Sequence, residues 1–360
     1  MRIAYLSADR GIPFGGSKGA AVHMAEMVRA LAASGAEVLL LPRAVTSGHD
    51  GFPGDVTVDP LPAVATDAAL ADWLEDRLSG FGAEALYERI SLHSAAGATA
   101  AGRLGIPHLV ELNAPLPEEA ARYRRLERPR EAERLERMVL SSADAVLAVS
   151  GPLVRYARER GASRVEVLPN AVDLERFTAP SGVREPRCVF VGALRPWHGV
   201  EVLAESWRLL GREAPALLVV GDGPGRSALE AVGADVIGAV PHGEVPALLS
   251  SASIGLAPYA PDAPGYFSPL KLFEYLAAGL AVVAGSIAGV REVVGPKHAV
   301  LVPPGDPVAL AGAVRELAGD ESKRARLGVA GRELVAAQHT WDRRARRILA
   351  LAYRLQPAIA

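Results

Sequence analysis

Short apolar runs alternate with amphipathic stretches from one end of the chain to the other, and this alternation constrains the fold more than any other feature. In the first half we predict buried strands at Arg2–Ser7, Val38–Leu41, Ala85–Tyr87, His108–Glu111, Ala145–Val149 and Val165–Leu168. Helical patterns lie between them, at Ala20–Ser34, Ala68–Ser79, Leu92–Leu104 and Pro152–Arg160. Strands that alternate with helices indicate a parallel sheet with helices on both faces.

A polar, proline-containing stretch, Thr178–Pro186, separates this half from a second one with the same rhythm. The predicted strands are Arg187–Val191, Ala216–Val220, Val236–Ile237, Ile254–Ala257, Ala281–Ala284 and Ala299–Val302. The predicted helices are Val200–Leu210, Arg226–Ala231, Val245–Ser251, Leu270–Ala278 and Val308–Leu317. The expected fold class is therefore α/β, with two doubly wound domains. Ligands bind such domains at the carboxyl ends of their strands, so we expect the two domains to face a central cleft.

The length agrees with this division, because 360 residues correspond to two domains of about 150 residues each. We expect a first domain over residues 1–177, a second over 178–340, and a C-terminal helix over 341–360 that packs back on the first domain. The stretch Pro117–Ser142 carries seven Arg and six Glu. We interpret it as a solvated helical excursion interrupted at Pro129. A mobile flap over the cleft and a membrane-surface patch are the alternatives.

Composition excludes several classes of protein. A formal net charge of −2 gives no reason to expect nucleic acid as a partner. The single cysteine, Cys188, permits neither an intrachain disulfide nor a cysteine metal cluster, which fits a reducing compartment. The longest uncharged runs, Val245–Pro261 and Tyr275–Val290, contain Pro, Ser or Gly and fall short of about 20 apolar residues. We expect a cytoplasmic protein without an integral membrane segment, either free or attached peripherally to a membrane.

Three glycine-rich loops follow predicted strands. The first holds Gly15, Gly16 and Lys18 and precedes a helix, a geometry that suits phosphate binding but matches neither the dinucleotide fingerprint nor the P-loop. The second, Gly192–Gly199, contains Arg195 and His198, of which Arg195 suits bidentate binding of phosphate oxygens. The third contains Gly221 and Gly223. Tight turns explain the glycines equally well, and a surface ion pair is the alternative for Arg195.

The segment Gly265–Gly279 combines the strongest chemical signals. Ser268 and Pro269 suit a cap and a first helical turn, so the free amides near Leu270 favour an anion. Only four of the 39 Lys and Arg residues are lysines, and one of them, Lys271, lies in this turn. Glu274 is placed to accept both hydroxyls of a ribose. An ion pair between Lys271 and Glu274 within the helix is the alternative.

Taken together, these segments resemble the retaining, family-4-type glycosyltransferases, whose GT-B fold consists of two Rossmann-like domains. The resemblance covers essentially the whole chain and is specific to the superfamily rather than to one substrate. The matching pieces occur in the family's order: Gly15-Gly16, Leu168-Pro169-Asn170-Ala171-Val172-Asp173, Gly192 to Gly199, Gly221-Asp222-Gly223, and Ser268 to Gly279.

The resemblance implies that the second domain binds a UDP- or GDP-linked sugar and that the first holds the acceptor, which is a small molecule, a glycan or a lipid-linked precursor. Arg195 and Lys271 would contact the diphosphate, with Gly16 and Leu270, and Glu274 would bind the ribose. The base would lie near Val240. His93 lies near the position of the family's histidine beside the donor sugar, and a capping or buried role is its alternative.

Two departures from the family's pattern concern the donor. His198 stands where the family usually has a lysine, and Tyr266, next to Phe267, stands where it usually has a first glutamate. A neutral imidazole stabilises phosphate less than a lysine does, unless a bound diphosphate raises its pKa. The missing carboxylate commonly meets the donor sugar, and the sequence Ser268-Pro269-Leu270-Lys271 resembles a variant of branches that lack it.

The expected chemistry is transfer of the sugar with retention of anomeric configuration. No Asp-x-Asp motif occurs in the sequence, so we expect no bound divalent metal, and no cofactor besides the nucleotide sugar as co-substrate. The alternatives are another GT-B activity, such as sugar-nucleotide epimerisation or sugar-phosphate transfer, and a non-catalytic protein that binds a sugar nucleotide.

Overall fold

The chain divides into two compact units, one formed by Met1–Pro169 with Trp341–Ala360 and the other by Asn170–Thr340. The computed structural model describes residues 1–16, 18–46, 55–178 and 185–356. The first unit ends at Pro169 rather than at 177, because Val172 pairs with Thr340 and Phe177 packs in the core of the second unit. Residues 179–184 of the expected linker lie outside the described residues.

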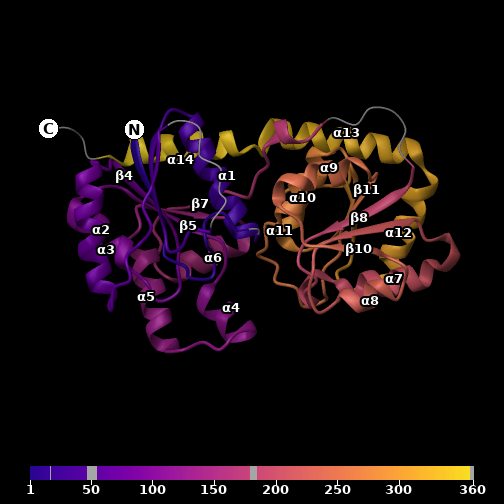
Figure 1. Ribbon diagram of the computed structural model, residues 1–360, viewed down its shortest axis with the longest axis horizontal. Helices are drawn as coiled ribbons and strands as arrows, with labels where there is room; N and C mark the ends of the chain where they lie inside the picture. Colours follow the sequence, from indigo (N-terminus) through magenta and orange to yellow (C-terminus); the bar gives the residue numbers. More distant parts are fainter. Residues whose placement is uncertain (17, 47–54, 179–184, 357–360) are drawn as a thin grey trace. The chain divides into compact units, whose positions relative to one another are not determined.

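The first unit is built on a parallel sheet, of which β4, β5 and β7 are labelled in Figure 1. The strand order is β3-β2-β1-β4-β5-β6-β7. Six of its strands follow the predicted apolar runs to within one or two residues, whereas β3 has no such run. The bounds are β1 Arg2–Ser7, β2 Glu37–Pro42, β3 Val56–Val58, β4 Ala85–Arg89, β5 His108–Leu112, β6 Ala145–Ala148 and β7 Val165–Val167.

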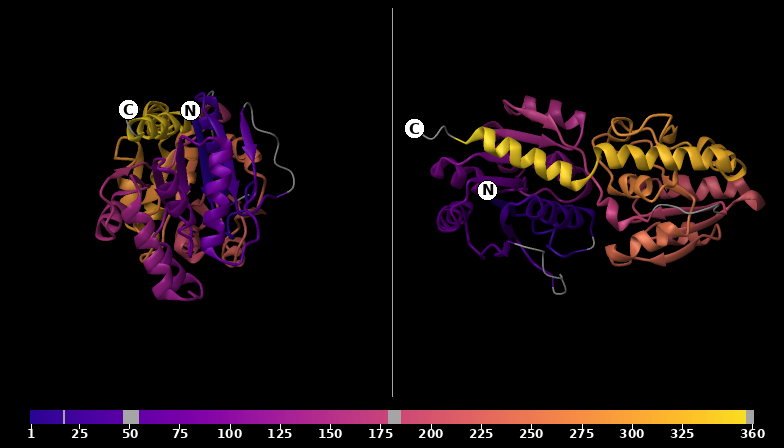
Figure 2. Two further views of the ribbon diagram at one scale, coloured as in Figure 1. Left: turned by 90° about the vertical axis from the view of Figure 1, so that its left-hand side faces the viewer. Right: turned by 90° about the horizontal axis from the view of Figure 1, so that it is seen from above.

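Helices cover both faces of this sheet. On one face, α2 (Asp67–Phe81) and α3 (Ala96–Leu104) bury the apolar side chains of β1, β2 and β4. Elsewhere in this unit, α1 (Gly19–Ala33) packs against α14 (Trp341–Leu355), and Figure 2 shows both helices from further sides. The remaining helices are α4 (Leu116–Tyr123), α5 (Pro129–Ser142) and α6 (Gly151–Glu159). Pro129 begins α5 instead of interrupting a helix, as its missing amide hydrogen permits.

The second unit has a parallel sheet in the order β10-β9-β8-β11-β12-β13. Successive residues of β8 face opposite sides, so Val189 lies in one core and Cys188 and Phe190 lie in the other. The bounds are β8 Arg187–Val191, β9 Ala216–Val220, β10 Asp235–Gly238, β11 Ile254–Ala257, β12 Ala281–Gly285 and β13 Ala299–Val302.

One face of this sheet carries α7 (Val200–Leu210), α8 (Arg226–Glu230) and α12 (Pro307–Gly319). The other carries α9 (Val245–Ser250), α10 (Leu270–Ala277) and α11 (Ala288–Arg291). Two helices follow α12: α13 (Glu321–Gln338) packs on α10 in this unit, whereas α14, which lies within the range of the predicted C-terminal helix, belongs to the first unit. Among the described helices, none combines the length and the apolar character needed to cross a bilayer.

The two strand orders confirm the predicted class, an α/β protein with two Rossmann-like domains. In each sheet the direction of winding reverses once, between β1 and β4 in the first unit and between β8 and β11 in the second. Ligands of such sheets bind at this switch point, beside the carboxyl ends of the strands. The loops that follow these four strands are therefore the expected positions of a ligand site.

Candidate functional site

The loop after β8 presents an arginine to solvent at the switch point of the second unit. Arg195 is exposed, and its guanidinium carbon lies 5.9 Å from the centroid of the Trp197 ring. Within the described part of the chain no carboxylate pairs with Arg195. The alternative of a surface ion pair is therefore not observed, and the guanidinium keeps its donors available for an anion.

His198 lies in the same loop and is held in one tautomer. Its Nδ1 lies 2.6 Å from the carbonyl oxygen of Ala193, which can only accept, so Nδ1 carries a hydrogen. Burial, and then the charge of Lys271, lower the pKa of His198 to about 3. The ring is therefore neutral at pH 7, and its Nε2 presents a lone pair instead of the positive charge of the family's usual lysine.

Lys271, on the first turn of α10, places an ammonium in apolar surroundings. Its Nζ lies 4.0 Å from the centroid of the Phe190 ring, and a side chain at Gly192 would place its Cβ 2.9 Å from the same atom. Burial lowers the pKa of the Lys271 ammonium to about 7, although the Glu274 carboxylate opposes the shift. Among the described residues no carboxylate bonds to the Lys271 ammonium, and an incoming anion would therefore stabilise its charged form.

Glu274 has a different partner from the one that its spacing predicts. Its Oε1 lies 2.6 Å from Nε2 of His242, and the side chain of Glu274 is only 8% exposed. No ion pair between Lys271 and Glu274 occurs among the described residues. The predicted alternative, pairing within the helix, is therefore not observed.

The loop before α10 is fixed by Asn170. The amide of Asn170 donates to Oγ of Ser268 at 3.0 Å, and its side chain donates to the carbonyl of the same residue. The prediction that Ser268 caps the helix is wrong, because Pro269 occupies the N-cap position and no side chain caps α10. The first turn therefore keeps amides at Leu270 and Lys271 without capping side chains.

Tyr266 and Phe267 precede this turn and contact each other edge to face, with ring centroids 5.1 Å apart. Phe267 also packs against the core of the second unit. Gly289 of α11 comes so close that a Cβ there would lie 1.9 Å from the carbonyl oxygen of Phe267. The backbone at Phe267 is therefore packed directly against α11.

The glycine loop after β9 lies against the loop after β8. A Cβ at Gly221 would lie 2.0 Å from the carbonyl oxygen of Gly192, and one at Gly223 would lie 2.9 Å from that of Leu194. Both glycines have positive φ, 145° and 151°. The contact between the two loops explains these glycines without a ligand. Val240, after β10, is half-buried and packs against the core.

In the first unit, the predicted residues lie in the loops after β1 and β4. Gly15 has a φ of 82°, and the ammonium of Lys18 donates to the carbonyl of Gly11 at 3.1 Å. Gly16 donates its amide to the carbonyl of Pro13 at 3.2 Å. His93 adopts the left-handed backbone conformation, with a φ of 64°, and its buried Nδ1 has no hydrogen-bond partner among the described residues. A strained backbone with an unpaired buried nitrogen is typical of a functional position.

The first unit also holds a buried carboxylate that the sequence did not reveal. Glu111, at the end of β5, is 2.7 Å from Nε2 of His23 and accepts hydrogen bonds from Tyr5, Tyr87, Arg89 and Asn113. Burial acts to raise the pKa of Glu111, but attraction to His23 and Arg89 holds that pKa well below its usual range. The sequence signal was a charged residue at the carboxyl end of a buried strand.

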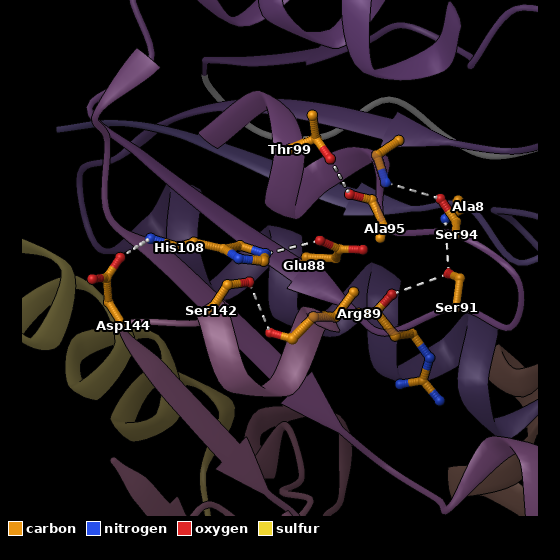
Figure 3. A network of polar contacts seen from close by, with 12 residues as sticks. Ala8, Glu88, Arg89, Ser91, Ser94, Ala95, Thr99, His108, Ser142 and Asp144 are labelled. Carbon is orange, nitrogen blue, oxygen red and sulfur yellow. Dashed lines mark hydrogen bonds and ion pairs between the residues drawn. The ribbon is translucent and has the colours of Figure 1, made fainter. Parts of the chain in front are cut away.

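A second buried pair lies next to this network. Glu88 and His108 are 2.8 Å apart at Oε2 and Nε2, and Oε1 of Glu88 has no partner among the described residues. Figure 3 shows this pair, with Arg89 pointing away from it. Adjacent residues of a strand face opposite sides of the sheet, so Glu88 and Arg89 belong to separate polar groups. Across the described residues, no group of three or more His, Cys, Asp or Glu side chains is arranged to hold a metal ion.

Within the second unit, the fold brings Arg195, His198 and Lys271 close enough for both cations to lower the pKa of the histidine. Gly15, Gly16, Lys18 and His93 belong to the other unit. Three residues that contact the predicted side chains were not themselves predicted as site residues: Asn170, Phe190 and His242. Asn170 could have been found in the quoted Leu168–Asp173 motif, and His242 could have been found beside the predicted base loop.

Two winding reversals, each with a glycine-rich loop at the strand ends, define a two-domain Rossmann-like protein. Its second unit carries the basic side chains Arg195 and Lys271 at the switch point of its sheet. The family model described as Glycosyltransferase Family 4 matches residues 17–176, and the one described as Glycosyl transferases group 1 matches residues 185–320. The chain belongs to these family-4-type, group 1 glycosyltransferases with the GT-B fold.

Two curated relatives illustrate the range of this family. The chain is 29% identical to the putative teichuronic acid biosynthesis glycosyltransferase TuaC of Bacillus subtilis, over 49% of this chain and 47% of that protein. It is 29% identical to the D-inositol 3-phosphate glycosyltransferase of Xylanimonas cellulosilytica, over 93% of this chain and 91% of the relative. The chain thus spans about half the length of the first relative and nearly all of the second.

Solved structures share the fold over the whole chain. The sucrose-phosphate synthase of Thermosynechococcus elongatus superposes with a TM-score of 0.76 at 20% identity, covering 98% of each chain. HepE of Anabaena, in complex with UDP-glucose, superposes with a TM-score of 0.73 at 17% identity, covering 97% of this chain and 99% of that one. At these identities the likeness establishes the fold alone.

Proposed function

We propose that this glycosyltransferase transfers a sugar from a nucleotide-diphosphate sugar, UDP- or GDP-linked, to an acceptor with retention of anomeric configuration and without a divalent metal. The observation that carries the proposal is the ammonium of Lys271, which lies over the Phe190 ring at the open first turn of α10. A half-buried ammonium that no carboxylate of the described residues pairs with, beside free helix amides, matches the charge of a diphosphate.

The roles follow from where charge develops. The bond between the sugar's anomeric carbon and the β-phosphate oxygen breaks, and its electron pair stays on the diphosphate. The acceptor atom bonds to the same face of the anomeric carbon and gives its proton to the leaving phosphate oxygen. Lys271, Arg195 and the amide of Leu270 would stabilise the departing charge, which is larger in the transition state than in the bound donor.

The remaining assignments rest on the family resemblance and on local geometry. Glu274 would accept the ribose hydroxyls, the loop at Val240 would contact the base, and Tyr266 with Phe267 would border the sugar. In the first unit, His93 has an unpaired Nδ1 that suits a sugar hydroxyl. We place the acceptor in this unit as well. HepE, whose solved structure holds UDP-glucose, makes UDP-glucose the first donor to test.

The test compares two charge deletions with two matched controls. Arg195→Ala and Lys271→Ala are each expected to lower turnover about 10²–10³-fold, by analogy with loss of an oxyanion donor, while the fold is retained. Arg208→Ala and Lys297→Ala remove exposed charges from the same unit and should leave turnover unchanged. A panel of UDP- and GDP-sugars first identifies the donor, and turnover and donor hydrolysis are then measured for all five proteins.

Near-normal turnover in both deletions would overturn the diphosphate assignment. Undiminished turnover in a chelator supports metal independence, and the anomeric configuration of the product, read by nuclear magnetic resonance, tests retention. Conversion of the donor without any acceptor indicates an epimerase instead. Nucleotide-induced thermal stabilisation without turnover or donor hydrolysis indicates a binding protein.

A further inference from the structure

Three side chains of the second unit form a hydrogen-bonded chain that ends on Glu274. Arg176 belongs to the short helix Leu174–Arg176, His242 to the short helix His242–Glu244, and Glu274 to α10. A guanidinium nitrogen of Arg176 lies 3.1 Å from Nδ1 of His242, and Nε2 of the same ring lies 2.6 Å from Oε1 of Glu274. Side chains from three separate elements are thus linked, with His242 in the middle.

The direction of the hydrogen bonds fixes the state of the imidazole. A guanidinium carries only donors, so Nδ1 of His242 must accept with its lone pair. The hydrogen of the neutral ring is therefore on Nε2, which donates to the Glu274 carboxylate. Arg176 also donates to the carbonyl oxygen of His242 at 3.3 Å, which holds the backbone of that residue as well as its ring.

The burial of both side chains stabilises the hydrogen bond between His242 and Glu274. The side chain of Glu274 is 8% exposed and that of His242 is 23% exposed, so water competes weakly for their hydrogen bond. Lys271 stands three positions before Glu274 on the same helix, and a carboxylate can reach a cation at that spacing. The carboxylate nevertheless bonds to His242, and the ammonium of Lys271 lies over the Phe190 ring.

We propose that His242 is a positioning residue for the ribose-binding carboxylate of Glu274, and that Arg176 selects the tautomer which does this. The inference rests on the proposed function, since it concerns how the donor's ribose is recognised. An ionised carboxylate has about four acceptor positions. His242 occupies one of them, which leaves enough for both ribose hydroxyls without breaking the bond to the histidine.

Removal of the hydrogen bond between His242 and Glu274 should cause a specific defect in nucleotide binding. Without the hydrogen bond from Nε2 of His242, the Glu274 carboxylate is free to turn toward Lys271. In that position it would no longer reach the ribose, and it would neutralise the ammonium that is proposed to bind the diphosphate. Recognition of the ribose hydroxyls should therefore weaken first. A purely structural role for His242 would instead lower the affinity for all nucleotides equally, whether or not they carry a 2′-hydroxyl.

The experiment measures binding of UDP, GDP and their 2′-deoxy counterparts by calorimetry, together with the KM and kcat of the best donor. His242→Leu removes the hydrogen bond, whereas His242→Gln places an amide hydrogen near the position of Nε2. Arg176→Leu removes control of the tautomer. The matched control is His298→Leu, because His298 belongs to the same unit and its ring, among the described residues, bonds only locally, accepting from the amide of Gly295. Thermal unfolding of each variant establishes that it is folded.

We expect His242→Leu to weaken binding of the ribonucleotide about tenfold, the range for loss of a hydrogen bond to a charged group. Binding of the 2′-deoxynucleotide should change far less, so the preference for ribose collapses. KM for the donor should rise more than kcat falls, Arg176→Leu should show a smaller effect of the same kind, and His242→Gln should restore the preference.

The experiment distinguishes failure of the positioning role from failure of the proposed function. Equal weakening of ribonucleotide and deoxynucleotide, or an unchanged preference for ribose in His242→Leu, would overturn the positioning role and leave the proposed function standing. Absence of any nucleotide binding by the unsubstituted protein would overturn the proposed function and this inference with it.

Discussion

At the scale of single residues, the role proposed for Lys271 conflicts with the stability of the folded protein. An ammonium surrounded by apolar groups costs free energy in the folded protein, and this cost lowers its pKa from 10.5 to about 7. The unfolded chain has no such cost. A residue that lowers the stability of the folded protein is expected where a bound ligand supplies the negative charge that neutralises it.

Lys271→Met should therefore stabilise the protein at pH 6, because it removes the buried charge but keeps an apolar chain of similar length. The lysine is protonated in both the folded and the unfolded state below about pH 7, so the full cost applies there. Between pH 7 and 10.5 the folded state stays neutral while the unfolded lysine loses its proton, and the cost disappears. The stabilisation should shrink across this window.

Urea unfolding of both proteins at a series of pH values measures the difference, and Lys297→Met, at an exposed lysine, serves as the control with no expected change. A difference that is independent of pH would contradict the assigned charge. Turnover of Lys271→Met should fall as it does for the alanine variant.

At the scale of elements, the loop before α10 depends on how closely α11 approaches it. Gly289→Ala would push a methyl group onto the backbone at Phe267, where the nearest atom is only 1.9 Å away. Overpacking of this kind typically costs about 1–3 kcal/mol, and it should displace the loop that precedes Lys271. We expect lower stability together with a loss of kcat/KM.

Gly295→Ala is the matched control, because a Cβ there would meet no atom of the described residues within 4 Å and the backbone at Gly295 does not have positive φ. Its stability should stay within about ±0.5 kcal/mol of the unsubstituted protein, with unchanged turnover. Equal behaviour of the two variants, in unfolding and in steady-state kinetics, would refute steric positioning of the loop by α11.

The elements also mark the limit of prediction from sequence. Apolar runs such as those of β1 and β8 were predictable to the residue, since continuous burial on both faces leaves a strong pattern. The strand β3 was missed because its Val56–Val58 segment is short and only half-buried. Helix α3 was predicted from Leu92 but begins at Ala96, because the left-handed conformation of His93 ends any helical pattern there.

For the candidate site, the sequence predicted which residues carry chemistry but not which hydrogen-bond partners they have in the fold. Lys271 and Glu274 share a helix at pairing distance, and local spacing therefore predicts an ion pair. The actual partner, His242, lies 32 positions away and is brought in by the fold. Likewise, Ser268 has the sequence of a cap, yet its hydroxyl accepts from Asn170, 98 positions away. Long-range hydrogen bonds leave no periodic signal.

At the scale of the whole molecule, the chain begins and ends in the same unit. Arg344 donates to the carbonyl of Pro169 at 2.8 Å, and the ring of Trp341 meets that of His23 edge to face at 4.9 Å. Leu351, on the same helix, is 1% exposed. The core of the first unit is therefore incomplete until α14 is in place, whereas the second unit has apolar cores of its own.

Leu351→Ala should consequently destabilise the first unit selectively. Truncation of a buried leucine typically costs about 2–5 kcal/mol, and native-state hydrogen exchange resolves where this cost is felt. We expect protection to fall in α1 and in the strands of the first sheet while that of β8 to β13 is maintained. Tyr353→Ala, at a side chain that is 71% exposed on the same helix, should change neither. A parallel loss of protection in both sheets would show instead that the two units unfold as one cooperative body.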